Sequence, residues 1–375
     1  MPPAVFVYDH RLSTHVLSEG HVMRPTRLRY TYELLEAYGV FRDRSLLVKP
    51  RLATRDEVLT FHTPDYVDAV RRISEGDTSV DGTSYNITER GDNPPYRGMY
   101  EAALLSTGAS LVAVDEVLSG RALAAFNVSG GLHHAMAGHA AGFCIFNDPA
   151  VAIKAALRQG RRVAYVDIDC HHGDGVQAAF YDTDQVLTVS LHESGRWLYP
   201  GTGEAREIGA GRGESYSVNL PLAPYTTDDT YLWAFREVVP PLLTAFKPDL
   251  LVTQLGVDTH YTDPITHMAL TTHGFTACVQ EFRAFAMPWV ALGGGGYDIS
   301  AVARCWTLAF AVMAGLDLPD DIPASYRGRY GLQRLHDVEE PRVDAAARDT
   351  ARSFAEKSVA EIKRLIFPRH GLPKS

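Results

Sequence analysis

The sequence predicts a single α/β domain with a central, mostly parallel β-sheet, helices on both faces and long loops at one edge. Two observations lead to this prediction. Short apolar runs alternate with longer helical stretches along the chain. Those runs are apolar throughout, which is typical of parallel strands buried between two layers of helices. Because no linker, internal repeat or low-complexity segment interrupts the 375 residues, we expect one domain over residues 1–375.

The individual elements follow from this alternation. The expected strands are Val5–Tyr8, Ala122–Phe126, Val163–Ile168, Val186–Leu191, Leu250–Leu255 and Trp289–Leu292. The expected helices are Arg27–Tyr38, Gly98–Leu118, Pro149–Arg158, Thr230–Ala245, Thr272–Phe285 and Ala301–Ala314. Thr54 with Glu57 three residues later indicates a capping box that opens a further helix. Each helix returns the chain so that the next strand can run parallel to the last.

The composition limits the kinds of partner. A net charge of −9 argues against general nucleic-acid binding, which needs a clustered basic surface. No apolar run reaches the roughly 18 residues of a membrane span, and residues 1–8 lack the pattern of a signal peptide. The four cysteines, at positions 144, 170, 278 and 305, form no CxxC pair. We therefore expect reduced thiols in a cytoplasmic, soluble protein without a membrane partner.

Acids, histidines and glycines gather where the expected strands end. These segments are Asn127–His134, Asp167–His172, Ser190–His192, Gly256–His260 and Gly293–Tyr297. In open parallel sheets, binding and catalytic sites form beyond the carboxyl ends of the strands. The sequence therefore predicts one site at this edge of the sheet.

Asp167, Asp169 and His171 alternate along the tip of one expected strand. Side chains two residues apart in an extended segment point to the same side. Oxygen and nitrogen ligands suit Zn²⁺ or Fe²⁺, and the lack of thiolates favours a catalytic over a structural metal site. Asp258, after a later strand, is the candidate for a further ligand. The alternative is a buried hydrogen-bonded Asp–His pair or a loop cap.

His133 and His134 follow two glycines that permit irregular backbone. Near a metal, two imidazoles can act as a general base and as a general acid or electrostatic partner. Asp167 and Asp174 are available to orient the two rings. The alternative interpretation is two hydrogen-bonded loop histidines.

Tyr297 follows four consecutive glycines at the end of an expected strand. The glycines match neither common phosphate-binding pattern. They indicate instead that the backbone passes close to a ligand while Tyr297 points inward. A tyrosine hydroxyl there can donate to the oxyanion of a tetrahedral intermediate. On its own, Tyr297 would more often be a packing residue.

Together these motifs resemble those of the histone deacetylase superfamily, close to its class I branch and to bacterial acetoin-utilisation deacetylases. The resemblance runs from about Tyr8 to about Trp306 and is strongest in residues 130–134, 142–144, 165–175 and 292–297. It implies an arginase/deacetylase-like fold and hydrolysis of N6-acetyl-lysine in proteins or peptides, with release of acetate. It further implies Zn²⁺, or Fe²⁺ in its place, bound by Asp169, His171 and Asp258.

The resemblance also implies roles for other residues. His133 and His134 match the tandem catalytic histidines, Asp167 and Asp174 their partners, and Tyr297 the carbonyl-polarising tyrosine. Substrate contacts are implied for Phe143 and Tyr199 in a narrow tunnel, for Gly142 beside them, for Asp92 at the rim, and for Arg27 in an internal cavity linked to acetate release. Ile265 stands where the polyamine-deacetylase branch carries a Glu, which favours lysine substrates.

Two structural K⁺ sites are implied in the same way. The first would use Asp167, Ser190 and backbone carbonyls of Asp169, His171 and Leu191. The second would use backbone at Phe180, Thr183, Val186 and Tyr216. Residues 319–375 carry no motif and are expected to form a helical extension of the same domain.

Three alternatives stay open at this point. An acetylpolyamine or other small acetyl-amine deacetylase would share the whole site. A ureohydrolase of the arginase type would need two Mn²⁺ ions and more carboxylates around a shared centre. A non-catalytic acyl-lysine-binding module would tolerate loss of a ligand or of the tyrosine. The sequence predicts no particular oligomer.

Overall fold

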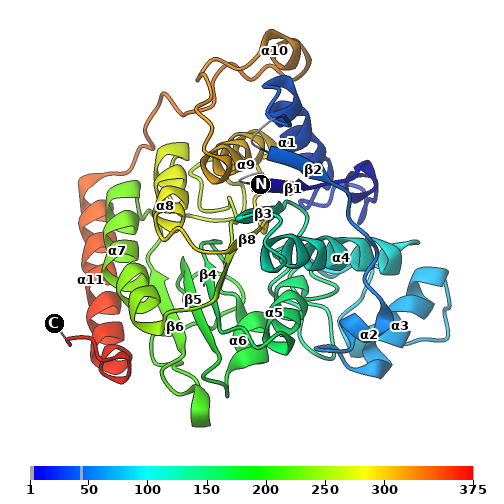
Figure 1. The fold of residues 1–375 in the computed structure, drawn as a ribbon, viewed down its shortest axis with the longest axis horizontal. Helices are drawn as coiled ribbons and strands as arrows, with labels where there is room; N and C mark the ends of the chain where they lie inside the picture. Colours follow the sequence, from blue (N-terminus) through cyan, green and yellow to red (C-terminus); the bar gives the residue numbers. More distant parts are fainter. Residues whose placement is uncertain (1–3, 43–44, 375) are drawn as a thin grey trace.

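The computed structural model describes residues 4–42 and 45–374, so the predicted domain of residues 1–375 reaches slightly beyond the described residues. Within them, eight strands form one sheet in the order β2-β1-β3-β8-β7-β4-β5-β6, with helices on both sides (Figure 1). Every pairing in this sheet is parallel. The predicted fold class is confirmed, and the sheet is fully rather than mostly parallel.

The strands have the following bounds: β1 (Ala4–Val7), β2 (Ser45–Val48), β3 (Ala124–Asn127), β4 (Val163–Asp167), β5 (Val186–Glu193), β6 (Ser217–Leu222), β7 (Leu250–Gln254) and β8 (Trp289–Leu292). All six predicted strands are present, each within two residues of the predicted bounds. The prediction missed β2 and β6, which are the two edge strands.

The helices are α1 (Thr26–Ala37), α2 (Arg55–Val58), α3 (Pro64–Glu75), α4 (Met99–Leu118), α5 (Asp148–Arg158), α6 (Asp174–Phe180), α7 (Asp228–Phe246), α8 (Thr272–Ala284), α9 (Ile299–Ala314), α10 (Ala324–Tyr330) and α11 (Ala345–Leu365). The six predicted helices are confirmed, and so is the capping box, in which Thr54 and Glu57 bond each other's backbone at the start of α2. The prediction named neither α3 nor α6.

Alternate residues of each strand face opposite cores, as the pleat requires. In β4, Val163 and Tyr165 pack with α4, α5 and α6 on one face. Ala164 and Val166 belong to the larger core on the other face, which contains α1, α7, α8 and α9. Both faces are therefore dry, which explains why the strands are apolar throughout.

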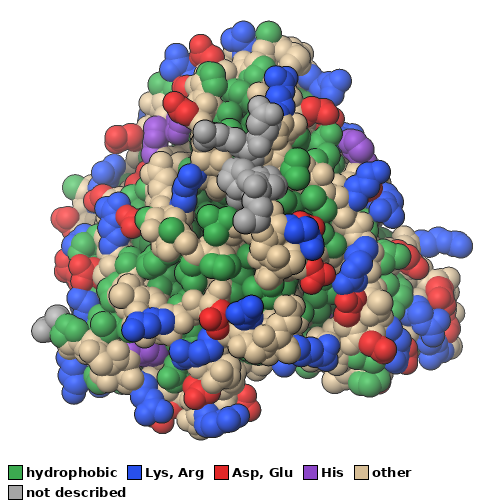
Figure 2. All heavy atoms as spheres, in the orientation of Figure 1, with side chains coloured by type: hydrophobic (Ala, Val, Ile, Leu, Met, Phe, Trp, Pro, Cys, Tyr) green, Lys and Arg blue, Asp and Glu red, His purple; other side chains and the backbone are tan. Residues whose placement is uncertain are grey.

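The C-terminal segment packs on this frame. Helix α11 lies along α7 and β6 (Figure 1) and contributes Ala355, Val359 and Ile362 to the larger core. Lys and Arg side chains are interspersed with Asp and Glu over the face in Figure 2. In the described part of the chain, no helix is both long and apolar enough to cross a membrane.

Candidate active site

The candidate site lies beyond the carboxyl ends of four neighbouring strands. In the sheet, β3, β8, β7 and β4 are adjacent in this order. The loop after β3 carries the histidine pair, the loop after β8 carries Tyr297, and the loops after β7 and β4 carry the candidate metal ligands. Chain segments more than 100 residues apart in the sequence therefore meet at one place because their strands are neighbours.

Three of the candidate ligands, Asp169, His171 and Asp258, converge in a buried group, which we call the metal group. Nδ1 of His171 lies 3.1 Å from an oxygen of Asp169 and 3.1 Å from an oxygen of Asp258. One ligand atom from each residue lies within 4.8 Å of the others, and this is the one such group in the described chain. Asp167, which shares their alternating pattern, turns its carboxylate to His133 instead.

The electrostatics of this group fit a divalent cation. Burial, together with the negative charge of Asp169, raises the pKa of Asp258 well above its usual range. Two carboxylates held this close without water are unfavourable unless a positive charge lies between them. An imidazole nitrogen and two carboxylates are ligand types that could hold a divalent metal ion here.

Each histidine of the tandem pair is held by its own carboxylate. Nδ1 of His133 lies 2.7 Å from Asp167, and Nδ1 of His134 lies 2.7 Å from Asp174. Their Nε2 atoms therefore face the pocket, 3.1 Å apart. The Nε2 of His133 is also 3.9 Å from Asp169, so the pair lies next to the metal group.

The two rings differ in charge. Burial disfavours a charged His133, but the carboxylates of Asp167 and Asp169 outweigh it and raise its pKa to about 9. Burial and the positive charge of His133 lower the pKa of His134 to about 4, despite its bond to Asp174. At neutral pH one ring is a cation and its neighbour is a neutral base.

Tyr297 lines the same pocket as the histidine pair and the metal group. Burial raises the pKa of Tyr297, so its hydroxyl stays protonated and can donate. The preceding glycines are needed for close approach, because a Cβ on Gly295 would lie 1.9 Å from an oxygen of Asp258. The pocket has a volume of about 10 Å³, which is room for about one water or small ion.

Aromatic side chains form the approach to this pocket. The ring of Tyr199 lies 5.1 Å from that of His134, and the ring of Phe143 lies 5.8 Å from that of Tyr297. Gly142 fits between them, since a Cβ there would meet His134 at 2.4 Å. Phe143 has a φ of 69°, a left-handed conformation that is strained in residues other than glycine and often marks functional sites.

The other predicted contacts lie further out. Asp92 is exposed. Burial raises the pKa of Tyr199, and the negative charge of Asp92 raises it further. Ile265 is half-buried in the loop that follows Asp258, and its amide donates to Asp263.

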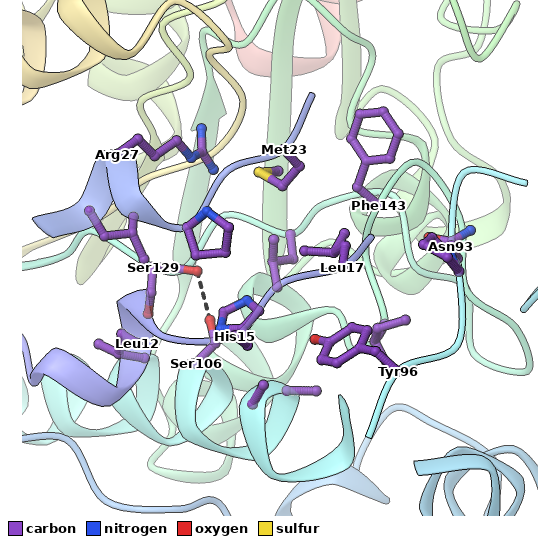
Figure 3. A pocket seen from close by; sticks show the side chains of 17 residues that line it. Leu12, His15, Leu17, Met23, Arg27, Asn93, Tyr96, Ser106, Ser129 and Phe143 are labelled. Carbon is purple, nitrogen blue, oxygen red and sulfur yellow. Dashed lines mark hydrogen bonds between the residues drawn. The ribbon is translucent and has the colours of Figure 1, made fainter. Parts of the chain in front are cut away.

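Arg27 borders a second cavity of about 70 Å³, which shares Met23 and Leu132 with the main pocket. Figure 3 shows Arg27, Met23 and Phe143 on one side of this cavity and His15 and Tyr96 on the other. The guanidinium donates to the carbonyls of Gly296 and Gly294 at 2.9 and 2.7 Å. Its Nε has no hydrogen-bond partner among the described residues.

The residues predicted for K⁺ form two groups. Ser190 pairs with Asp167 across β5 and β4, and both oxygens of Asp167 accept hydrogen bonds, one of them from the Asp169 amide. His171 lies in the loop after β4, and Leu191 follows Ser190 on β5. At the opposite end of the strands, the Thr183 amide donates to the Phe180 carbonyl. Beside them, Val186 begins β5 and Tyr216 directly precedes β6.

The sequence interpretation missed three side chains that hold the site together. Gln254 donates to Asp169 at 2.6 Å and to the carbonyl of Gly131. Asp148 accepts from the amides of Gly131 and Leu132, just before the histidine pair. Asp263 accepts from the amide of Tyr297 at 2.8 Å. Gln254 ends β7, and Asp148 begins α5. A polar residue directly beside an apolar run was the feature of the sequence that could have identified them.

A buried Asp-His-Asp group with a neutral base beside it, set at the carboxyl edge of a parallel sheet, is typical of a metal-dependent hydrolase. The sequence comparisons lead to the same class and narrow it. The histone deacetylase domain model matches residues 21–313. The chain belongs to the histone deacetylase family, and it is accordingly a hydrolase that removes acetyl groups.

Individual relatives agree with this assignment. Acetoin utilization protein AcuC of Bacillus subtilis is 41% identical over 334 residues, which cover 87% of this chain and 86% of that protein. Histone deacetylase 1 of Homo sapiens is 39% identical over 321 residues, 85% of this chain and 66% of that protein. A crystal structure of an HDAC homolog complexed with SAHA is 31% identical, with a TM-score of 0.87, and covers 96% of this chain and 100% of that chain.

Proposed function

We propose that this chain hydrolyses the amide of N6-acetyl-lysine in proteins or peptides, with Zn²⁺ bound by Asp169, His171 and Asp258. The observation that carries the proposal is one pocket lined by Asp169, His171, a carboxylate-bound histidine pair and Tyr297, with the buried Asp258 carboxylate within 4.8 Å of the other two ligand atoms. When bound, the ion supplies a Lewis acid that polarises a carbonyl and makes water more acidic. Fe²⁺ suits the same ligands and is the other candidate.

In the proposed reaction, His134 removes a proton from the attacking water as the new C–O bond forms. It is the neutral ring of the pair, and Asp174 orients its other nitrogen. His133, held as a cation by Asp167, stabilises the negative charge of the intermediate. As the C–N bond breaks, a proton from the pair passes to the departing amine, and acetate is the second product.

Tyr297 donates its hydroxyl to the acyl oxygen in this proposal. The negative charge on that oxygen grows in the transition state, so a fixed donor there lowers the barrier more than it strengthens substrate binding. The Asp263 carboxylate fixes the backbone of Tyr297, which reduces the reorganisation needed during the reaction.

The approach supports a slender aliphatic amine as substrate. Phe143, Gly142 and Tyr199 would surround the lysine stem, and exposed Asp92 would accept hydrogen bonds from peptide amides at the rim. Ile265 offers no charge that would attract a polyamine, which ranks acetylpolyamines second. Arg27 would bind the acetate that is released, since its buried guanidinium faces the adjoining cavity.

The remaining site residues are proposed for structural K⁺. A buried carboxylate, a hydroxyl and backbone carbonyls form the hard oxygen set that K⁺ prefers. Asp167, Ser190, Asp169, His171 and Leu191 would supply the first ion. Phe180, Thr183, Val186 and Tyr216 would supply the second.

We also propose a cytoplasmic location, supported by four buried free thiols, which a reducing compartment maintains. The C-terminal residues 319–375 are proposed to belong to the same domain, since α11 shares its core.

One experiment tests the proposed function. The purified chain is assayed against acetyl-lysine peptides, acetylated polyamines and a guanidino compound, and metal is quantified in the same sample. We expect one divalent metal per chain and the highest kcat/KM on the peptides. Two Mn²⁺ ions with guanidino hydrolysis would establish a ureohydrolase. A preference for acetylpolyamines would overturn the substrate, and binding of acetyl-lysine without turnover would indicate a binding module.

A further inference from the structure

The chain beyond the match to the family model reaches the active-site loops. The matched region ends at residue 313, and the segment that follows forms α10, an extended stretch and α11. Asp337, in the extended stretch, is almost fully buried, with 6% of its side chain exposed. A buried carboxylate needs partners, and those of Asp337 come from elements that carry the catalytic machinery.

Four groups bond the Asp337 carboxylate and amide. His260 Nε2 lies 2.8 Å from Oδ2, Arg304 of α9 donates to Oδ1 at 2.6 Å, and the Thr272 amide at the start of α8 donates to Oδ2 at 2.8 Å. The Asp337 amide in turn donates to the Thr272 hydroxyl. Burial opposes ionisation of Asp337. The hydrogen bonds from His260, the Thr272 amide and Arg304 outweigh burial and keep the pKa of Asp337 well below its usual range.

His260 connects Asp337 to the metal group. It is two residues after the proposed ligand Asp258, is 2% exposed, and its amide bonds the carbonyl of Val257. The His260 ring is therefore held in a fixed position on the loop after β7. A ligand carboxylate in such a loop is held in place only as firmly as the loop itself.

A second path leads from His260 to the tyrosine. Nδ1 of His260 lies 2.9 Å from the Thr262 hydroxyl, which donates to the carboxylate of Asp298. Asp298 directly follows Tyr297 and caps α9 by accepting from the amides of Ser300 and Ala301. The His260 ring is thus linked, through Thr262, to the residue that follows Tyr297.

We propose that Asp337 is a positioning residue for the active site: by fixing His260, it holds the loop of Asp258 and the loop of Tyr297 in register. The inference rests on the proposed function for its catalytic readout, but its effect on metal binding does not depend on the substrate. Residues that orient metal ligands from behind typically change metal affinity by about 10–100-fold when they are replaced.

The test compares Asp337→Asn with the wild type. The substitution keeps the size of the side chain but places an amide N–H against donors that the carboxylate accepted. We expect the Zn²⁺ Kd, measured by chelator competition, to rise about tenfold. We expect kcat on an acetyl-lysine peptide to fall by a similar factor at saturating Zn²⁺, and amide exchange in residues 258–263 to accelerate.

Two further variants separate positioning from general stability. Asp344→Ala removes the N-cap of α11 in the same C-terminal segment, which costs about 1 kcal/mol of stability. We expect it to lower Tm while the Zn²⁺ Kd and kcat stay unchanged. His260→Gln keeps a donor that can reach Asp337 and should stay near wild type, whereas His260→Leu should reproduce Asp337→Asn.

Distinct outcomes decide the two proposals. A wild-type Zn²⁺ Kd and kcat in Asp337→Asn, or equal losses in Asp344→Ala, would overturn the positioning role. If the wild type binds Zn²⁺ but cleaves no acetylated substrate, the proposed function fails, and the Kd and exchange measurements still decide the role of Asp337.

Discussion

The floor of the site and its rim are built by different means. The floor consists of Asp169, His171, Asp258, His133 and His134, none of which is more than 7% exposed. Each of these side chains has a fixed partner from the protein. On the rim, Tyr199 is 42% exposed, and Asp92 is exposed as well. Contacts within the protein fix the floor, whereas the rim is free to meet different substrates.

This difference assigns chemistry to the floor and selectivity to the rim. Preorganised groups contribute most where charge develops in the transition state. Exposed side chains contribute to recognition, and their substitution usually changes the free energy of unfolding only slightly. Substitutions on the floor should therefore reduce kcat for every substrate, and substitutions on the rim should reduce kcat/KM for some substrates only.

The largest effect is expected at the metal group. Asp258→Ala removes one of the three proposed ligands and leaves His171 bonded to Asp169 alone, so bound metal and activity should both fall below detection. Metal analysis and a peptide assay on the same sample measure this. Asp184→Ala, a half-buried acid in the loop before β5 at the opposite end of the strands, is the control and should retain both. Full metal content in Asp258→Ala would contradict the ligand assignment.

Loss of the neutral histidine should come next. His134→Ala removes the proposed general base, and such groups contribute about 10²–10⁴-fold in rate. We expect kcat to fall by that range for peptides and for small acetylated amines alike, with metal still bound. His139→Ala, on an exposed position of the same loop, should behave like the wild type. Activity within about tenfold of wild type in His134→Ala would show that another group takes the proton.

Tyr297→Phe tests the oxyanion donor. Loss of one such donor costs about 2.7–4 kcal/mol in the transition state, so kcat should fall by about 10²–10³-fold. KM and metal content should change little, because the ring still fills its place beside Phe143. Tyr225→Phe removes a hydroxyl from an exposed tyrosine and serves as the control. A change confined to KM would contradict the proposed oxyanion role and group Tyr297 with the rim.

A substitution on the rim should separate the substrates. Asp92→Ala removes a charged acceptor for peptide amides, which is worth about tenfold or more in kcat/KM. Small acetylated amines lack those amides and should lose little. Glu89→Ala, an exposed acid three residues away, should affect neither substrate class. An equal loss on both classes would remove the distinction between floor and rim at this position.

The remaining prediction concerns stability rather than rate. Behind the histidine pair, the buried His62 accepts from the Asn147 amide at 2.9 Å, and burial lowers its pKa to about 4. Its folded pKa lies below the unfolded value of about 6.5, so its contribution is complete above pH 6.5 and is lost as the pH falls toward 4. The wild type should lose about 2 kcal/mol between pH 7.5 and 5 through this residue.

His62→Gln supplies an acceptor without a titratable ring, so its unfolding free energy should fall less over the same range. Urea unfolding of both proteins at pH 7.5 and 5, with metal removed by chelator, measures the difference. Parallel pH dependence in the two proteins would show that His62 is not held neutral.

The contrast between floor and rim also explains what could be predicted from the sequence. Most of the floor could be predicted because its residues lie in short motifs, His133 with His134 and Asp169 with His171, that follow strands with a clear apolar pattern. Asp258 follows a third such strand, 87 residues after His171. Strand β6 was missed because Asn219 and Pro221 interrupt its pattern, which an edge strand tolerates. Strand β2 was missed because Leu46 and Leu47 are partly exposed and the strand is only four residues long.

Contacts between distant segments could not be predicted. His260 and Asp337 are 77 residues apart, and each is an ordinary polar residue in its own surroundings. Gln254 and Asp169 are 85 residues apart and meet only because β7 and β4 are neighbours. Such pairs depend on strand order, which the apolar pattern of the chain does not contain.

The strand order also determines when the enzyme can first work. Strand β8 is the last to be synthesised, yet it lies between β3 and β7 near the middle of the sheet. A nascent chain that ends before residue 289 can form two part-sheets, β2-β1-β3 and β7-β4-β5-β6, each with an open edge. Only when β8 joins them do the histidine pair, the metal group and Tyr297 share one pocket. Activity should therefore appear abruptly, late in synthesis, and the open edges before that point make the growing chain a natural client for chaperones.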